Sequence, residues 1–403
     1  MENSNKSSRI KFSELQHLLR EPMRLCRWTG FFSVDGLSES TISSIRCSIK
    51  FPYIFFHIAS ILGQFITTAL SLITFCKNTC SLLTSSYLLF YSTGLITAML
   101  IVNLSKNWAR LLRNTSEIET SLVGIRRPHN SWKYKSIAYI IMSLAVVEHI
   151  LSIMSNIHKA MSELNESEIN DKVLERYFTG SMPFILNMSF YSLWKAVPFM
   201  IANLQATFLW NVTDVMIMCI SIYLTSYLQD LNKIIYENQI SKSVPWEDIR
   251  MHYSQLVALV KEVDSRFCHL VLLSFFTNLF FISLQLFNAL NALHLIYYIY
   301  SFVFLMARAS VMCLLAANVH KAAQEPLFVV RYVPASEYTL VIQRFIRQIR
   351  YTTTALSGVY FYVTRSTLLK AVGTLLTYEL VLLQFNLEIV GATTRRRNLT
   401  WND

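Results

Sequence analysis

The stretch STLLKAVGTLLTYELVLLQFNLEIV, residues 366–390, is apolar over a length that can cross the hydrocarbon core of a membrane, which takes about 20 residues of α-helix. It nevertheless carries Lys370, Glu379, Gln384 and Glu388. Ionisable groups in hydrocarbon cost at least about 2.5 kcal/mol each, so such positions usually serve a function. We therefore expect a spanning helix whose polar side chains face something other than lipid.

Six further apolar windows of spanning length precede this stretch. They cover residues 51–75, 82–104, 136–158, 188–226, 267–291 and 294–318. Across its 403 residues the chain is 53% hydrophobic and only 15% charged, which is too little charge to cover the surface of a soluble protein of this length. The sequence predicts an all-α membrane protein with seven transmembrane helices.

The basic residues predict the orientation of these helices. Segments 1–50, 105–135, 229–266 and 319–365 hold 26 of the 36 Lys and Arg. The segments on the opposite side of the membrane, 76–81, 159–187, 292–293 and 391–403, hold 7, and the other three lie inside the spans. Because Lys and Arg concentrate in cytoplasmic loops, the N-terminus is expected inside and the C-terminus outside, opposite to G-protein-coupled receptors. The first 50 residues show no signal-peptide pattern, so the first spanning helix is expected to address the chain to the membrane. The net charge of +11 is a topology signal and predicts no nucleic-acid partner.

Two cytosolic segments have the helical period. In 247–267 the apolar residues recur every three or four positions, at Ile249, Tyr253, Leu256, Val260, Val263 and Phe267. The segment 337–349 repeats the pattern through Phe345 and Ile349, with Leu340 or Val341 before them. Amphipathic helices are therefore expected before spanning helices five and seven, and their apolar faces need partners within the subunit or across subunits.

The last span separates its polar residues into two groups. On a helical projection Lys370, Thr374, Thr377, Val381, Gln384 and Glu388 fall within about 40° of one line. Such a stripe suits a water-filled path enclosed by several copies of the helix, and the alternative is a polar helix buried in one bundle. Glu379 points to nearly the opposite side, so we hypothesise a buried ion pair with Arg308, for which Asp214 is a competing partner.

A second polar and aromatic set lies in the outer halves of spans two to six. Its members are Tyr87, Tyr91, Glu148, His149, Ser152, Asn156, Tyr191, Trp194, Gln285, Asn288, Tyr297 and Tyr298. Aromatic faces combined with amide and carboxylate acceptors suit a polyhydroxylated ligand, whose C–H faces stack on rings and whose hydroxyls need hydrogen bonds. The alternative is the aromatic belt that lines membrane interfaces for lipid reasons alone.

Motifs of enzymes are missing from the sequence. It has no GxGxxG, Walker, HExxH or GxSxG pattern and no metal-ligand spacing among its nine His, so neither catalysis nor a cofactor is predicted. Among the seven Cys, Cys76 and Cys80 alone fall near an outer loop, where a disulfide or two free thiols are both open.

The last span resembles the C-terminal signature of insect gustatory receptors, which is Thr-Tyr, five mostly hydrophobic residues, then Gln-Phe. Here these are Thr377-Tyr378 and Gln384-Phe385. Glu379 departs from the general pattern, but TYE resembles the version found in the sugar-receptor branch. The stretches FLWNVTDVMIMCISIYL (208–224), LLSFFTNLFFISLQLFNALN (272–291), RYVPASEY (331–338) and TRSTLLKAVGTLLTYELVLLQFN (364–386) are also similar to that branch.

The resemblance implies a tetrameric ion channel with the fold of the insect odorant receptors. It implies a cytosolic segment 1–50, a ligand-pocket bundle 51–228, a cytosolic helical extension 229–266, helices five and six over 267–318, anchor helices 319–365, a pore-lining helix 366–390 and an extracellular tail 391–403. In this picture Gln384 and Phe385 lie at or beside the outer gate.

The function predicted is therefore a sugar-gated, non-selective cation channel of sweet taste in the plasma membrane of sensory neurons. Its expected partners are an extracellular mono- or disaccharide, the lipid bilayer and three further copies, or related receptors in a heteromer. The expected pocket residues are Tyr91, Glu148, His149, Ser152, Asn156, Tyr191, Trp194, Gln285, Asn288 and Tyr298. The rivals are an odorant-type receptor of the same fold, a metabotropic receptor and a solute transporter.

Overall fold

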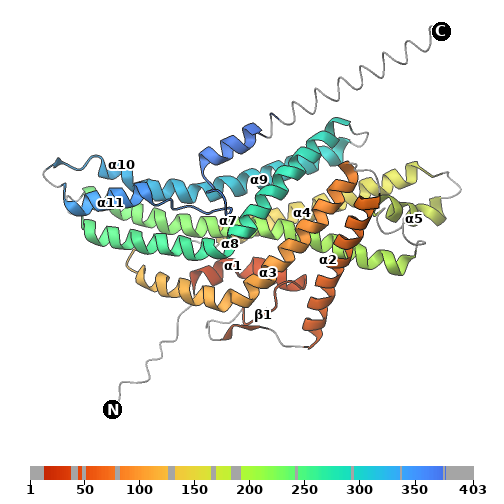
Figure 1. The fold of residues 1–403 in the computed structure, drawn as a ribbon, viewed down its shortest axis with the longest axis horizontal. Helices are drawn as coiled ribbons and strands as arrows, with labels where there is room; N and C mark the ends of the chain where they lie inside the picture. Colours follow the sequence, from red (N-terminus) through yellow and green to blue (C-terminus); the bar gives the residue numbers. More distant parts are fainter. Residues whose placement is uncertain are drawn as a thin grey trace, which may run out of the picture.

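The computed structural model describes residues 13–37, 44–47, 51–77, 82–125, 132–164, 169–182, 192–240, 244–291, 295–335, 338–374 and 377. The regular secondary structure within them is α-helical, apart from one pair of two-residue strands, β1 (Val34–Asp35) and β2 (Arg46–Cys47), which pair antiparallel, and one isolated bridge between Ser357 and Tyr362. The molecule is an elongated bundle whose longest helices run along its length (Figure 1).

The helices follow in this order. They are α1 (Glu14–Trp28), α2 (Phe51–Lys77), α3 (Leu82–Ser121), α4 (Trp132–Ser162), α5 (Ile169–Ser181), α7 (Leu193–Ile240), α8 (Trp246–Asn291), α9 (Leu295–Gln324), α10 (Pro326–Val330) and α11 (Leu340–Tyr351). Residues 365–374 are also helical and form the start of the seventh predicted span.

Six helices in the described part are long and apolar enough to cross a membrane, namely α2, α3, α4, α7, α8 and α9. Each overlaps one of the first six windows predicted from sequence. The segment 247–267, expected as a separate amphipathic helix, is instead continuous with the span after it in the 46-residue α8. No Pro or Gly interrupts residues 246–291, so nothing in the backbone ends the helix between the two parts.

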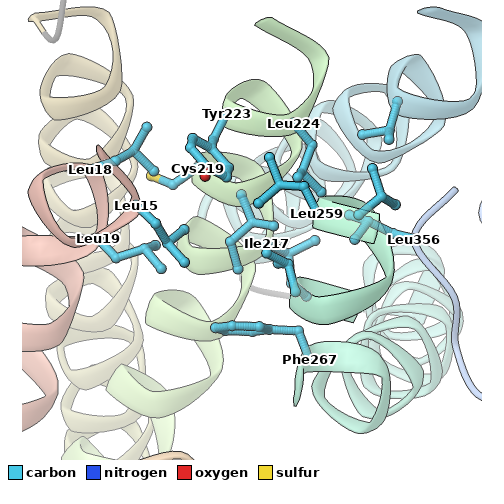
Figure 2. Packing of buried hydrophobic residues seen from close by; sticks show 14 of the residues in the cluster. Leu15, Leu18, Leu19, Ile217, Cys219, Tyr223, Leu224, Leu259, Phe267 and Leu356 are labelled. Atoms are coloured by element: carbon cyan, nitrogen blue, oxygen red, sulfur yellow. The ribbon is translucent and has the colours of Figure 1, made fainter. Parts of the chain in front are cut away.

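The core is built around α7, which packs on α1, α3, α8 and α9. Figure 2 shows Ile217, Cys219 and Tyr223 of α7 between leucines of α1 on one side and Leu259 and Phe267 of α8 on the other. The six residues predicted to form the apolar face of 247–267 are all at most 2% exposed, which confirms that prediction. Phe345 and Ile349 of α11 are also buried, and the Phe345 ring packs edge-on against Tyr253 of α8 with centroids 5.3 Å apart.

Helix α2 is polar inside and apolar outside. Its buried residues are Ser60, Gln64, Thr67, Ser71 and Thr74, at successive intervals of three or four, whereas Leu62 and Phe65 are about half exposed. Gln64 Nε2 donates to the carbonyl of Ala202 in α7 at 2.7 Å. In lipid, apolar side chains gain nothing from facing inward, so small polar residues and hydrogen bonds hold such a helix to its neighbours.

Helix α1 lies in the predicted cytosolic segment and was not predicted as an element. Its buried face includes Leu15, Leu19 and Met23. The N-cap Ser13 makes no capping bond of its own, and Glu119 of α3 caps the helix instead, accepting from the backbone N–H of Glu14 at 2.9 Å and of Leu15 at 3.2 Å. Two of the N–H groups that the first turn leaves without a partner inside the helix are thus satisfied by another helix.

Candidate functional site

A buried ion pair joins α7 to α9 in the middle of the bundle. Arg308 Nε lies 2.9 Å from Asp214 Oδ2, and both side chains are at most 2% exposed. Asp214 also accepts hydrogen bonds from Ser274 Oγ at 2.5 Å and from Asn278 Nδ2 at 3.1 Å, both on α8. Of the two partners considered for Arg308, Asp214 is the one that the structure brings to it. Glu379, the other, lies outside the described residues.

The Arg308 guanidinium is held by further contacts. Its Nη1 donates to Asn211 Oδ1, and its Nη2 donates to Asn278 Oδ1 at 3.2 Å. The group lies over the ring of Trp210, 4.6 Å from the centroid, and 5.4 Å from the centroid of Phe304. Stacking on aromatic rings with charge-assisted hydrogen bonds is how a buried guanidinium is stabilised. The pair therefore fixes α7, α8 and α9 relative to one another.

A small cavity of about 50 Å³ opens beside Arg308. It is lined by Glu148, Thr207, Trp210, Asn211, Phe281, Gln285, Ser301, Phe304, Leu305 and Arg308. The lining comes from α4, α7, α8 and α9 and combines a carboxylate, a guanidinium and two amides with three aromatic rings. We call these ten residues the central cavity. Polar groups set among aromatic surfaces are the ordinary make-up of a small-molecule site.

Two residues predicted as ligand contacts meet in the central cavity. Glu148 of α4 accepts from Ser301 Oγ at 2.9 Å and from the Tyr297 hydroxyl at 3.4 Å, both on α9. Gln285 of α8 turns its Oε1 into a buried position where it accepts no hydrogen bond from any residue that the structure describes. A buried acceptor without a donor is costly, so Gln285 is suited to a ligand hydroxyl or a water.

The other predicted ligand residues do not line the central cavity. Tyr91 is buried in a separate cluster with Met182, where its hydroxyl accepts from Asn203 Nδ2 at 3.0 Å. Trp194 is 74% exposed. The remaining predicted residues are placed as follows: Tyr87, His149, Ser152, Tyr297 and Tyr298 are half-buried, Asn156 is exposed, and Tyr191 and the side chain of Asn288 lie outside the described residues.

The predicted gate falls mostly beyond the described part of the chain. Thr377 is exposed, whereas Val381, Gln384, Phe385 and Glu388 lie outside the described residues. Of the predicted cysteine pair, Cys76 is an exposed free thiol, and Cys80 also lies outside them.

None of the three aromatic rings that line the central cavity, Trp210, Phe281 and Phe304, was predicted from the sequence. Trp210, Asn211 and Asp214 continue a stripe from Thr207 at intervals of three, four and seven on α7, and Ser301, Phe304, Leu305 and Arg308 repeat those intervals on α9. Two stripes with the same spacing, each ending in one member of a charge pair, are the sequence pattern that could have predicted this lining.

Comparison with known proteins places the chain. The trehalose receptor family matches residues 1–391. The chain belongs to this family. Among its relatives in Drosophila melanogaster, gustatory receptor 5a for trehalose is 30% identical over 311 residues, which are 74% of this chain and 69% of the relative. Gustatory receptor for sugar taste 64f is 29% identical over 364 residues, which are 88% of this chain and 76% of the relative. The family is one of gustatory receptors, not of enzymes.

The fold has a counterpart among solved structures. The insect olfactory receptor OR5 from Machilis hrabei superposes with a TM-score of 0.65 at 16% identity, over 93% of this chain and 100% of OR5. Its complex with eugenol superposes with a TM-score of 0.64. This similarity confirms the expected likeness to the insect odorant receptor fold.

Proposed function

We propose that this receptor is a sugar-gated, non-selective cation channel of sweet taste in the plasma membrane of sensory neurons, and that the central cavity binds the sugar. The observation that carries the proposal is the convergence of Glu148, Gln285 and Arg308 with the rings of Trp210 and Phe304 around one cavity. A sugar has hydroxyls that need donors and acceptors on its rim and C–H faces that pack on rings.

The size of the cavity supports gating by ligand. About 50 Å³ holds little more than water, whereas ligand pockets usually measure about 300 to 1,000 Å³. A sugar must therefore separate the helices that line the cavity before it fits. Because Arg308 and Asp214 join three of these helices, an enlarged cavity changes how α7, α8 and α9 are packed. Sugar would then favour a second conformation by binding it better.

The names of the relatives support the ligand class. They include a receptor for trehalose and receptors for sugar taste, all near 30% identity. Trehalose is accordingly the first sugar to test here. We propose the orientation inferred from the basic residues, N-terminus inside and C-terminus outside. A tetramer would enclose a pore with its seventh helices, with Thr377, Val381, Gln384, Phe385 and Glu388 along the pore.

Recording from purified protein in a lipid bilayer tests the function. We expect cation current on addition of trehalose or another sugar to the C-terminal side. A metabotropic receptor would carry no current. A transporter would show tracer uptake of sugar without ionic current, and an odorant-type receptor would respond to volatile compounds only. Each of these results contradicts the proposal. If the protein alone gives no current, co-expression with a related receptor distinguishes a chain that works only in a heteromer from one that has no sugar-gated current.

Gln285→Met tests the site itself. It keeps the length of the side chain and removes the acceptor, so the half-maximal sugar concentration should rise roughly three- to tenfold. The matched control is Phe276→Leu on the same helix, because Phe276 is 49% exposed and does not line the cavity. An unchanged Gln285→Met response would remove Gln285 from the site.

A further inference from the structure

A tight turn leads from the cytosolic helix α11 into the seventh helix. Val363 N–H donates to the Leu356 carbonyl at 2.8 Å, and Ser357 pairs with Tyr362 in an antiparallel bridge. Leu356 and Val363 are at most 1% exposed. The helix of residues 365–374 begins two residues after Val363. We call residues 356–363 the linker turn.

The backbone of the linker turn is strained at Val359. Tyr360 N–H donates to the Gly358 carbonyl at 2.7 Å, which closes a three-residue γ-turn, and Val359 at its centre has φ of 65°. This form of the γ-turn is rare, and a β-branched residue with positive φ is an outlier. Strain of this kind persists only where surrounding contacts impose it. The contacts that impose it here should therefore be identifiable.

Asp264 of α8 supplies the polar contact. Its Oδ1 accepts from the Ser357 N–H and its Oδ2 accepts from Ser357 Oγ, both at 2.7 Å. An apolar contact lies beside it, because the Phe361 ring packs edge-on against Phe275 of α8 with centroids 5.4 Å apart. Both contacts tie the linker turn to the helix that carries Gln285 of the central cavity and Asn278, which bonds to Arg308.

The linker turn is also bonded to the first turn of the seventh helix. Thr364 Oγ1 accepts from the Thr367 N–H at 3.2 Å as an N-cap, and Thr367 Oγ1 donates to the Tyr362 carbonyl at 3.0 Å. Phe275, beneath Phe361, lines a groove of about 290 Å³ together with Leu368 and Val372 of the seventh helix. A change in the linker turn therefore moves the start of this helix relative to α8.

We propose that the linker turn is a strained coupling element between α8 and the seventh helix, and that Asp264 is the positioning residue that holds it in the sugar-free conformation. The proposal rests on the proposed function for its electrical consequences. The central cavity is too small for a sugar in this structure, so the contacts seen here belong to the form without sugar. Contacts that exist in one form stabilise that form.

Two substitutions then act in opposite directions. Asp264→Ala removes both bonds to Ser357, which frees the strain and should raise the sugar-free current and lower the half-maximal sugar concentration about fivefold. Val359→Gly leaves Asp264 in place and removes the strain, because glycine adopts positive φ without steric cost. It stabilises the sugar-free form, so it should lower the sugar-free current and raise the half-maximal concentration. A residue that merely supports folding would not give changes of opposite sign.

Matched variants and a second measurement complete the test. Asp264→Asn keeps an acceptor for the Ser357 N–H and a donor for its hydroxyl, so it should behave like the wild type. Hydrogen exchange without sugar should speed up at Ser357, Val363 and residues 365–368 in Asp264→Ala but not in Val359→Gly. Changes of the same sign in both variants, or faster exchange confined to residues 356–363, overturn the proposal. If the wild type carries no sugar-evoked current, either alone or with a related receptor, the proposed function fails, and the exchange of residues 365–368 alone decides whether the linker turn couples to the helix.

Discussion

Arg308 Nε lies 2.9 Å from Asp214 Oδ2 between α7 and α9, and the two side chains are almost completely buried. A pair of charges in this position is costly to desolvate and gains its stability from additional hydrogen bonds. Ser274, Asn211 and Asn278 supply these bonds from α7 and α8. The pair thus lies at the junction of three helices, next to the cavity proposed for the sugar.

Removing one member of this pair should be far more damaging than removing both. Arg308→Met leaves the Asp214 carboxylate without its charge partner, for which the expected loss of stability is about 3 to 5 kcal/mol. The double variant Asp214→Leu with Arg308→Met should recover most of the thermal stability measured in detergent. It should nevertheless lose its sugar response, because Arg308 lines the cavity. A double variant as unstable as the single one would show that the hydrogen bonds, not the charges, stabilise the junction.

Glu148 should be required for sugar sensitivity more than for folding. Its carboxylate bonds to Ser301 and Tyr297 while facing the central cavity. Glu148→Gln keeps the shape and removes the charge, and a hydrogen bond to a charged group contributes about 1.5 to 3 kcal/mol. The half-maximal sugar concentration should therefore rise at least about tenfold in bilayer recordings.

The control for Glu148 is Ser301→Ala, which removes one donor to the carboxylate and leaves the charge. Its effect on sugar sensitivity should be smaller than that of Glu148→Gln. Equal effects of the two variants would indicate that the Glu148–Ser301 bond holds α4 to α9 and that the carboxylate does not contact the ligand.

How much of this could be predicted differs between the fold and the site. The spans follow from hydropathy because a membrane demands a continuous apolar length, and the face of 247–267 follows from the helical period. The inward polar face of α2 was not predicted, because a hydropathy window averages over all sides of a helix and does not show which side faces the protein. Residues 15, 18, 19, 23 and 26 carry the period of α1, but the helix as a whole is too polar to stand out among the spans.

Only part of the site was predicted, because some of its residues are distinctive in the sequence and others are not. Glu148 and Gln285 can each be predicted separately, because polar residues are unusual in spans. Trp210 and Phe304 are ordinary residues in spans, and their role depends on Arg308 lying between them. The partner of Arg308 could not be chosen from sequence either, because Asp214 and Glu379 both lie at mid-span depth. Only the packing of α7 against α9 brings Asp214 to it.

Glu119 should hold α1 on the bundle. It accepts hydrogen bonds from Ser13, the Glu14 and Leu15 N–H groups and the Tyr223 hydroxyl. Glu119→Ala leaves these donors without an acceptor, at an expected cost of about 1 to 3 kcal/mol. Hydrogen exchange of the first turn of α1 measures the loss. Ser13→Ala removes one of the four donors and should have a smaller effect. Equal exchange in both variants would contradict the capping role.

The same carboxylate predicts a pH dependence. Burial raises the pKa of Glu119 above its ordinary value, and the bonds from Tyr223 and the α1 backbone offset part of this rise. A raised pKa in the folded state means that the fold binds the proton more tightly than the unfolded chain does. Stability from Glu119 therefore increases as pH falls from neutral toward the ordinary pKa of glutamate. Compared with Glu119→Gln, which cannot titrate, the wild type should gain thermal stability over this range. A difference that does not change with pH would contradict the sign.

Gln64 should be essential on α2, although a leucine there would make the helix more hydrophobic. Its Nε2 donates to the Ala202 carbonyl at 2.7 Å, and its side chain is fully buried against α7. Gln64→Leu removes this bond and gains nothing from burial, because lipid is as apolar as the protein interior; interhelical bonds of this kind contribute about 0.6 to 1.7 kcal/mol. The thermal midpoint in detergent should fall, whereas the exposed control Phe65→Leu should keep it. A stable Gln64→Leu would mean that small-residue packing alone, as at Gly94 against Ala206, holds α2 and α3 to α7.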